Sequence, residues 1–379
     1  MKRILAVLFL FAASCADTNN DSKPEPMPTA TPGRYRSEGG DYPVGAIPNG
    51  TLYDGQRNKD LELVIEYPSR GEGPFPVIVF SHGYGGSNKG YVALTEYWAG
   101  HGYVCIKPSH ADAGKLRDVV REQLRERREA REAGREPDRT LGEAIWQDQG
   151  VAQWRDRVRD VTFILDSFDA LEERYPELKG KLDRNHIAVA GHSYGAFVAM
   201  LLGGVQPVLD GKPLQLADPR VKAILAMSPQ GVSATRGLTP ESFRDVKIPA
   251  MYMTGTNDRG ALEGETAEWR RGAFDNSPAG DKYFVLIEGA SHMSFTGGFS
   301  LPSAAEESLD RIDDADRQRN PNRVRATPRT ETRFMQERGV LDIVKAGSTA
   351  FWDTYLKSAP AARDYLDTKL TGRATVVKK

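Results

Sequence analysis

Residues 186–204 read HIAVAGHSYGAFVAMLLGG and carry the strongest structural signal in the chain. Their first part, residues 187–190, is a short apolar run, as expected for a strand that is buried on both faces. Their second part, residues 196–202, is apolar for long enough to form a buried helix. The residues between them, GHSYG at 191–195, fit the pattern G-x-S-x-G. The stretch therefore predicts a strand, a sharp turn that carries Ser193, and a helix.

The geometry of this turn explains which types of residue occur in it. A serine at this position has a strained backbone, and its hydroxyl projects from the end of the sheet. Gly191 and Gly195 fit the turn because a β-carbon at either position would collide with neighbouring backbone. The helix that follows directs unpaired N–H groups toward the place where negative charge develops on a reacting substrate. An ordinary glycine-rich turn with an incidental serine is the structural alternative, but the flanking strand and helix favour Ser193 as a nucleophile.

The composition sets the broad class of protein. The chain has 379 residues, a formal net charge of -1 and the apolar and charged fractions of an ordinary globular protein. This length fits one large α/β domain or two smaller ones. The near-neutral charge argues against a nucleic-acid partner, because no dominant basic surface is implied.

The N-terminal residues predict export. Lys2 and Arg3 precede an apolar run over residues 4–13, and small residues then lead to Cys15. This order is that of a secretory signal, and the apolar run is too short for a normal membrane span. The small residues ahead of Cys15 also resemble a bacterial lipoprotein signal, in which the cysteine becomes the lipid-bearing first residue. We therefore expect a signal peptide of the lipoprotein type over residues 1–15, with simple secretion as the alternative.

The segment after this signal predicts a tether and then one folded domain. A lipid anchor on Cys15 would be the only link to a membrane, at the bacterial cell envelope; without lipidation the protein would be periplasmic or secreted. Residues 16–33 are rich in Asp, Asn, Pro, Thr and Ser, which predicts a disordered tether. The domain is expected over residues 34–379. The sequence leaves the oligomeric state open.

A second glycine-rich loop follows an earlier strand. The apolar run VIVF at residues 77–80 predicts a buried strand, and HGYGG follows at residues 82–86. Glycines in such a loop let backbone N–H groups approach a substrate closely. A phosphate-binding loop or a plain turn is the alternative, but the chain has no G-x-x-x-x-G-K-[ST] pattern.

Two later strands supply the other candidate catalytic side chains. Asp258 comes shortly after the predicted strand over residues 248–255, and His292 follows the predicted strand over residues 282–288. His292 is the only histidine after Asp258, and the order Ser, Asp, His is one of the known orders of serine hydrolase triads. The structural alternatives are a turn-forming aspartate and a surface-loop histidine. We predict Ser193 as the nucleophile, His292 as the base and Asp258 as the acid.

Taken together, the HGYGG loop, the GHSYG turn and the later aspartate and histidine resemble the α/β-hydrolase superfamily. Within it, the chain is similar to secreted esterases of the dienelactone-hydrolase, polyester-hydrolase and platelet-activating-factor-acetylhydrolase kinds, over roughly residues 77–288. The resemblance implies an α/β fold with a mostly parallel central sheet and helices on both faces. It also implies an oxyanion hole formed by the backbone N–H groups of Tyr84 and Tyr194, with His82 as a residue that orders the loop.

Two segments and one pair of residues are not part of the motifs that carry the resemblance. Residues 113–150 predict a helical insertion after the fourth core strand, either a charged, solvated excursion or a lid over the pocket. Residues 300–332 predict a polar excursion near the catalytic histidine or a surface loop. His110 and Asp112 precede the insertion at the end of a strand, where they line the pocket or make structural hydrogen bonds.

The predicted function is cleavage of carboxylic esters by a serine esterase through an acyl-enzyme. The substrate would be a small-molecule, lipid or polymer ester. No metal or cofactor is expected, because the histidines and carboxylates show no ligand spacing such as H-E-x-x-H.

Two other functions remain open: a lipid deacylase of the platelet-activating-factor-acetylhydrolase type, and a non-catalytic surface lipoprotein on a hydrolase scaffold. Some acetylhydrolases of the superfamily carry the triad acid directly after the strand that corresponds to residues 221–227. In this chain Ser228-Pro229-Gln230 follow that strand and contain no carboxylate, which moves the chain away from that subgroup.

Overall fold

The computed structural model describes residues 40–296 and 331–379, except residues 139, 261, 263, 369 and 371. Two compact units are distinguished along the chain, residues 1–34 and 35–379, and the described residues belong to the second. The signal peptide predicted over residues 1–15, the tether predicted over residues 16–33 and residues 300–330 of the predicted excursion lie outside the described residues.

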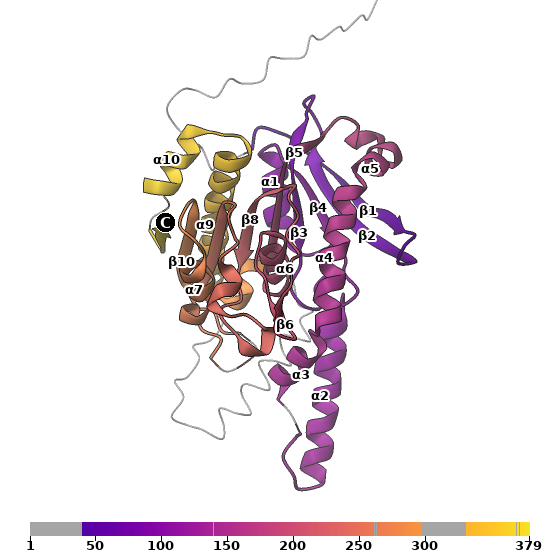
Figure 1. The fold of residues 1–379 in the computed structure, drawn as a ribbon, viewed down its shortest axis with the longest axis vertical. Coiled ribbons are helices and arrows are strands. Elements are labelled where there is room, and N and C mark those ends of the chain that lie inside the picture. Colours follow the sequence, from indigo (N-terminus) through magenta and orange to yellow (C-terminus); the bar gives the residue numbers. More distant parts are fainter. Residues whose placement is uncertain are drawn as a thin grey trace, which may run out of the picture. The chain divides into compact units, whose positions relative to one another are not determined.

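Within the described residues, nine strands form one sheet in the order β1-β2-β4-β3-β5-β8-β9-β10-β11 (Figure 1). The six strands from β4 to β10 in that order are parallel to one another, whereas β1, β2 and β11 pair antiparallel at the two sides. The strands are β1 (Val44–Asp54), β2 (Lys59–Pro68), β3 (Phe75–Ser81), β4 (Val104–Pro108), β5 (Leu182–His192), β8 (Val221–Met227), β9 (Ala250–Asn257), β10 (Lys282–Ser291) and β11 (Ala374–Lys378). Two short strands, β6 (Val208–Leu209) and β7 (Lys212–Pro213), form a separate hairpin.

Helices cover both faces of the sheet (Figure 1). The helices α4, α6 and α7 contribute to one cluster of buried apolar side chains, and α1, α9 and α10 contribute to the other. The helices are α1 (Val92–Gly100), α2 (Lys115–Glu132), α3 (Leu141–Asp148), α4 (Val151–Asp166), α5 (Phe168–Arg174), α6 (Tyr194–Leu202), α7 (Ala267–Asn276), α9 (Glu331–Leu356) and α10 (Pro360–Thr368). Short 3-10 turns lie at Pro176–Leu178, Ala234–Arg236, Pro240–Phe243 and His292–Thr296, the last of these being η4.

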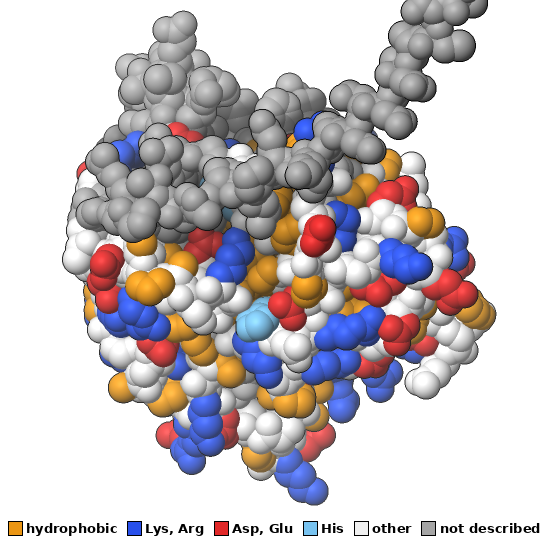
Figure 2. Space-filling model, turned by 90° about the horizontal axis from the view of Figure 1, so that it is seen from above, with side chains coloured by type: hydrophobic (Ala, Val, Ile, Leu, Met, Phe, Trp, Pro, Cys, Tyr) orange, Lys and Arg blue, Asp and Glu red, His pale blue; other side chains and the backbone are white. Residues whose placement is uncertain are grey.

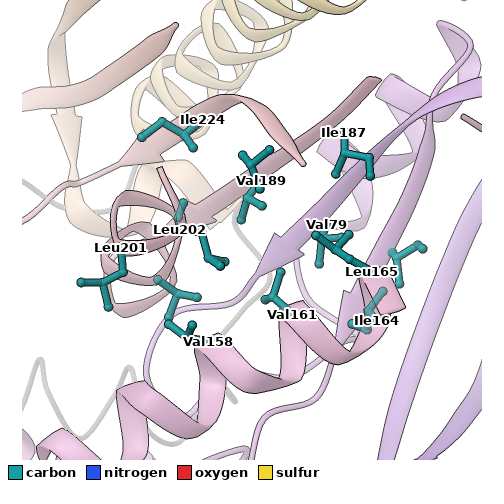
Figure 3. Close-up of a cluster of buried hydrophobic side chains, with 14 of the residues drawn as sticks. Val79, Val158, Val161, Ile164, Leu165, Ile187, Val189, Leu201, Leu202 and Ile224 are labelled. Carbon is teal, nitrogen blue, oxygen red and sulfur yellow. The ribbon is translucent and has the colours of Figure 1, made fainter. Parts of the chain in front are cut away.

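The central strands divide their side chains between these two clusters. In β3, Val77 and Val79 belong to the cluster with α4, while Ile78 and Phe80 belong to the cluster with α1. This follows from the strand period of two, and it explains why the strands read as continuous apolar runs. Figure 3 shows the first cluster, in which side chains of α4 face those of β3 and β5 across the interface.

The sequence did not predict the two edge strands. In β1, Pro48 and two glycines break the apolar alternation, and the pairing with β2 shifts between Ile47 and Gly50. Edge strands and irregular pairings tolerate such residues because one side of the strand needs no partner. β11 is only five residues long and is separated from the other strands by α9 and α10, so it gives a weak signal.

The helical insertion predicted over residues 113–150 directly follows β4, the fourth strand along the chain, and consists of α2 and α3, which lie side by side (Figure 1). The charged part of α2 is exposed: Arg125 and Glu129 are paired across one turn, and each side chain is 58% exposed. Val120, Gln123 and Ala130 of the same helix are buried. One narrow stripe of α2 therefore packs against the protein while the rest is solvated.

Two surface properties complete the description. No helix among the described residues has the length and apolar character needed to span a membrane. Figure 2 shows acidic and basic side chains interspersed with hydrophobic ones on the face that it presents, without a large area of one sign.

Candidate active site

Ser193 lies at the turn between β5 and α6, as the sequence predicted. Its backbone has φ 56° and ψ -115°, a conformation that residues other than glycine rarely adopt and that indicates local strain. A β-carbon at Gly195 would overlap the carbonyl oxygen of Ser81, and a β-carbon at Gly191 would overlap the carbonyl oxygen of Gly195. The tight turn thus requires glycine at both flanking positions.

The structure brings the side chains of Ser193, His292 and Asp258 together. His292 Nε2 lies 3.0 Å from Ser193 Oγ, and His292 Nδ1 lies 2.8 Å from Asp258 Oδ1. An ionised carboxylate can only accept a hydrogen bond, so Nδ1 carries the proton and Nε2 is left to accept the proton of the serine hydroxyl. Asp258 is fully buried, whereas the His292 side chain is 25% exposed, which leaves the serine end of the chain of hydrogen bonds open to a substrate.

A buried arginine that the sequence analysis did not single out holds Asp258 from another side. Arg270 of α7 has its Nε 3.1 Å from Asp258 Oδ1, and its Nη1 donates to the carbonyl oxygen of Ser228 at 3.0 Å. Burial raises the pKa of Asp258, but the hydrogen bond from His292 and the positive charge of Arg270 outweigh it and hold that pKa well below its usual range. Asp258 is therefore a carboxylate at any pH at which the protein works.

Tyr84 and Tyr194, the predicted oxyanion-hole residues, are neighbours, with ring centroids 6.2 Å apart. In the described part of the chain, the hydrogen bonds include no acceptor for the backbone N–H of either residue. Tyr194 is the first residue of α6, so its N–H has no partner within the helix. Backbone donors of this kind, one of them on the residue that follows Ser193, are suited to stabilising a developing negative charge.

His192, the residue before the serine, links the glycine-rich loop at residues 82–86, called the oxyanion loop below, to the turn that carries His292. Its Nε2 donates to the carbonyl oxygen of His292 at 3.0 Å, so its Nδ1 accepts from the hydroxyl of Tyr91 at 2.8 Å. The Tyr91 oxygen in turn accepts the N–H of Gly83 at 3.3 Å. Burial, together with the charge of His292, holds the pKa of His192 well below its ordinary value, so this bridge remains neutral.

The structure resolves the alternatives for His110 in favour of structural hydrogen bonds. His110 Nδ1 donates to Asp160 Oδ2 at 2.8 Å, and its Nε2 accepts from Ser81 Oγ at 2.9 Å. These hydrogen bonds repeat the order of serine, histidine and aspartate in a serine triad. Ser81 is 0% exposed, however, so its hydroxyl cannot meet a substrate. Asp112 is buried as well and accepts hydrogen bonds from Arg157 and from the N–H of Gly85.

The helical insertion contacts the oxyanion loop through Tyr84. The Tyr84 hydroxyl donates to Asp148 Oδ2, at the end of α3, at 2.6 Å. Gln153 Nε2 donates to the same oxygen at 3.2 Å. Burial and the neighbouring Asp148 raise the pKa of Tyr84, so its hydroxyl keeps its proton. The insertion is thus bonded to a residue that is a candidate for the oxyanion hole.

Over the described residues, no group of three or more His, Cys, Asp or Glu side chains is arranged to hold a metal ion. Cys105 is a free, buried thiol within β4, and burial raises its pKa well above the ordinary value.

Two comparisons of sequence match part of this chain to acetylhydrolases. Residues 57–203 match the family model described as platelet-activating factor acetylhydrolase, isoform II. A platelet-activating factor acetylhydrolase from Cavia porcellus is 26% identical to this chain, over 42% of the chain and 43% of that protein. The similarity therefore spans less than half of the relative's length.

A solved structure shows a related fold. It is that of a ferulic acid esterase from Streptomyces cinnamoneus, which superimposes with a TM-score of 0.52 at 18% identity, over 89% of this chain and 96% of that chain. The family match contains the glycine-rich loop and Ser193 but ends at residue 203, before Asp258 and His292. It therefore bears on the nucleophile region and not on the position of the acid.

Proposed function

This chain has the α/β-hydrolase fold, as its sequence resemblance implied, and we propose that it is a serine hydrolase that cleaves carboxylic esters. The similarity to an acetylhydrolase family and the likeness in fold to an esterase support ester chemistry. The observation that carries the proposal is the chain of hydrogen bonds from Ser193 through His292 to Asp258, at 3.0 and 2.8 Å.

In the proposed mechanism, Ser193 Oγ attacks the ester carbonyl carbon while His292 Nε2 takes the hydroxyl proton. Asp258 stabilises the resulting imidazolium. The N–H groups of Tyr84 and Tyr194 hold the negative oxygen of the tetrahedral intermediate. When that intermediate collapses, the C–O bond breaks and His292 passes its proton to the departing alcohol. A water molecule, deprotonated by His292, then attacks the acyl-enzyme. The bond to Ser193 Oγ breaks, His292 returns the proton to Ser193, and the acid is released.

A lipid deacylase of the acetylhydrolase type is the second candidate. It uses the same chemistry on a phospholipid ester, and the family match together with the curated relative favours it. The missing carboxylate at residues 228–230 does not weigh against it strongly, because the match stops before that position. A panel of short-acyl, feruloyl, polyester and short-acyl phospholipid substrates separates the two candidates by their relative kcat/KM.

We also propose that the chain is exported, with a signal peptide over residues 1–15 and a tether over residues 16–33 that joins a lipid-bearing Cys15 to the hydrolase domain. This proposal rests on the sequence alone. A non-catalytic surface lipoprotein would have the same leader, so only an activity measurement distinguishes it from the esterase.

The decisive experiment replaces the nucleophile. We expect Ser193→Ala to lower p-nitrophenyl ester turnover by roughly 10⁴-fold or more and to abolish fluorophosphonate labelling. The exposed Ser69 provides the matched control, since Ser69→Ala should keep both turnover and labelling. Retained turnover in Ser193→Ala would exclude Ser193 as the nucleophile. A wild-type protein that neither turns over esters nor reacts with the probe would instead support the non-catalytic alternative.

A further inference from the structure

Arg157 of α4 is a buried cation directly behind the oxyanion loop. Its side chain is 1% exposed, and it pairs with Asp112, which is 3% exposed. Arg157 Nε donates to Asp112 Oδ1 at 2.8 Å, and Nη2 donates to Oδ2 at 2.6 Å. This is the two-pronged geometry in which an arginine binds a carboxylate most strongly and with least freedom.

The remaining N–H groups of Arg157 bind the oxyanion loop itself. Nη1 donates to the carbonyl oxygen of His82 at 2.5 Å and to Ser81 Oγ at 3.3 Å, and Nη2 donates to the carbonyl oxygen of Gly83 at 3.3 Å. A guanidinium has five N–H donors, so every donor of Arg157 is used. Three of them act on the consecutive residues Ser81, His82 and Gly83, at the end of β3 and the start of the loop.

The carbonyl of Gly83 is the decisive acceptor, because it belongs to the same peptide unit as the N–H of Tyr84. Besides Arg157, His82 Nδ1 donates to this oxygen at 2.7 Å and the N–H of Gly86 donates at 3.0 Å. In a trans peptide, the C=O and the following N–H point in opposite directions. Donors that fix the carbonyl of Gly83 therefore also fix the direction of the Tyr84 N–H.

Two further contacts extend the effect of this ion pair. Asp112 Oδ2 also accepts the N–H of Gly85 at 2.9 Å, so the loop is bound on both sides of Tyr84. The guanidinium carbon of Arg157 lies 4.4 Å from the ring centroid of Tyr194, the residue with the second oxyanion N–H. One ion pair thus touches both residues from which the oxyanion donors come.

We propose that Arg157 and Asp112 are positioning residues that set the oxyanion hole by holding the Gly83–Tyr84 peptide and packing against Tyr194. This inference rests on the proposed ester hydrolysis. Neither side chain reaches the substrate. Both act through backbone groups whose direction matters only when negative charge develops on the substrate oxygen, so their loss lowers kcat and leaves KM nearly unchanged.

The test removes the pair as a unit, because deleting one member alone leaves a buried charge without its partner. In the double variant Arg157→Met with Asp112→Asn, active sites are first counted by titration with a fluorophosphonate. We expect kcat per titrated site to fall by about 10²-fold, with KM within about twofold. Affinity for a trifluoromethyl ketone inhibitor, whose serine adduct places an oxyanion in the hole, should fall by a similar factor.

Two controls separate positioning from mere folding. Arg220 and Asp218 form a pair of the same two-pronged geometry at the start of β8, at 2.9 and 2.6 Å. The matched double variant Arg220→Met with Asp218→Asn should keep kcat per titrated site and inhibitor affinity. Arg157→Lys keeps the charge but cannot form the fork, and it should have a kcat per titrated site between those of the wild type and of the double variant.

One outcome of the same experiment would contradict the positioning role. If the Arg157/Asp112 variant has fewer titratable sites but a wild-type kcat per site and an unchanged inhibitor affinity, the pair only stabilises the fold and the inference is wrong. That outcome leaves the proposed function intact, because the proposed function depends on Ser193→Ala being inactive.

Discussion

At the scale of single residues, the most distinctive feature is a carboxylate that binds both an imidazole and a guanidinium. Asp258 Oδ1 accepts the proton of His292 Nδ1 at 2.8 Å and lies 3.1 Å from Arg270 Nε. Arg270 Nη1 also donates to the carbonyl oxygen of Ser228 at 3.0 Å. Arg270 therefore helps to fix the carboxylate that orients the imidazole of His292.

This arrangement predicts a loss of turnover when Asp258 loses its second partner. In Arg270→Met, Asp258 keeps the hydrogen bond from His292 but is held less firmly, so kcat should fall by about 10- to 10²-fold. Steady-state kinetics with a p-nitrophenyl ester measure kcat. Arg270→Lys keeps the positive charge and should lose less activity, and an unchanged kcat in Arg270→Met would contradict the idea.

The sequence revealed some residues of this site and not others, for a physical reason. Ser193 stands in a motif whose glycines are required sterically, and His292 is the only histidine after Asp258. Arg157 and Arg270 reach the site from the helices α4 and α7. Their partners are distant in sequence, so neither spacing nor a local motif marks them.

At the scale of elements, the buried strands were predictable because burial imposes a pattern. Helix α4 carries Val158, Val161 and Ile164 at helical spacing, and Figure 3 shows these side chains against the sheet. The edge strands β1 and β11 were not predicted, since an edge strand need not be apolar on both faces. The apolar pattern thus identified the elements that form the core, and it missed those that complete the sheet.

The packing of α4 gives a prediction about stability. Ile164 is fully buried in the cluster of Figure 3, and Ile164→Ala should lower the free energy of unfolding by about 2–5 kcal/mol, through lost burial and the cavity left behind. Val151 of the same helix is 39% exposed, and Val151→Ala should change the free energy by no more than about 0.5 kcal/mol. Guanidinium unfolding curves measure both. Equal effects for the two variants would show that α4 does not pack as described.

At the scale of the whole molecule, burial and pairing shift the pKa values of many side chains, although the near-neutral composition gives no sign of this. Burial holds the pKa values of His82, His101, His110 and His192 below the ordinary histidine value, with the charge of Arg157 adding to the effect at His82 and His110. Ion pairs and hydrogen bonds overcome burial and hold the pKa values of Asp112, Asp160 and Asp258 below the ordinary aspartate value. The net charge of -1 shows none of this, because pairing depends on the fold.

The lowered pKa values of these histidines and aspartates predict that the protein loses stability in acid. Each histidine takes up a proton more readily when the chain is unfolded, so its contribution is complete above about pH 6.5 and declines below that value. Each aspartate contributes fully above about pH 4 and loses its contribution as the pH falls further. The urea midpoint should therefore be lower at pH 5 than at pH 7.5. The exposed His186 offers a control, since His186→Asn should show the same decrease, and a midpoint that does not change with pH would contradict the prediction.

The bond between Tyr84 and Asp148 has a consequence for redesign. A chimaera with a foreign segment in place of α2 and α3 would lose Asp148, the acceptor of the Tyr84 hydroxyl. Such a chimaera must therefore carry a carboxylate at the matching position to keep this phenol held.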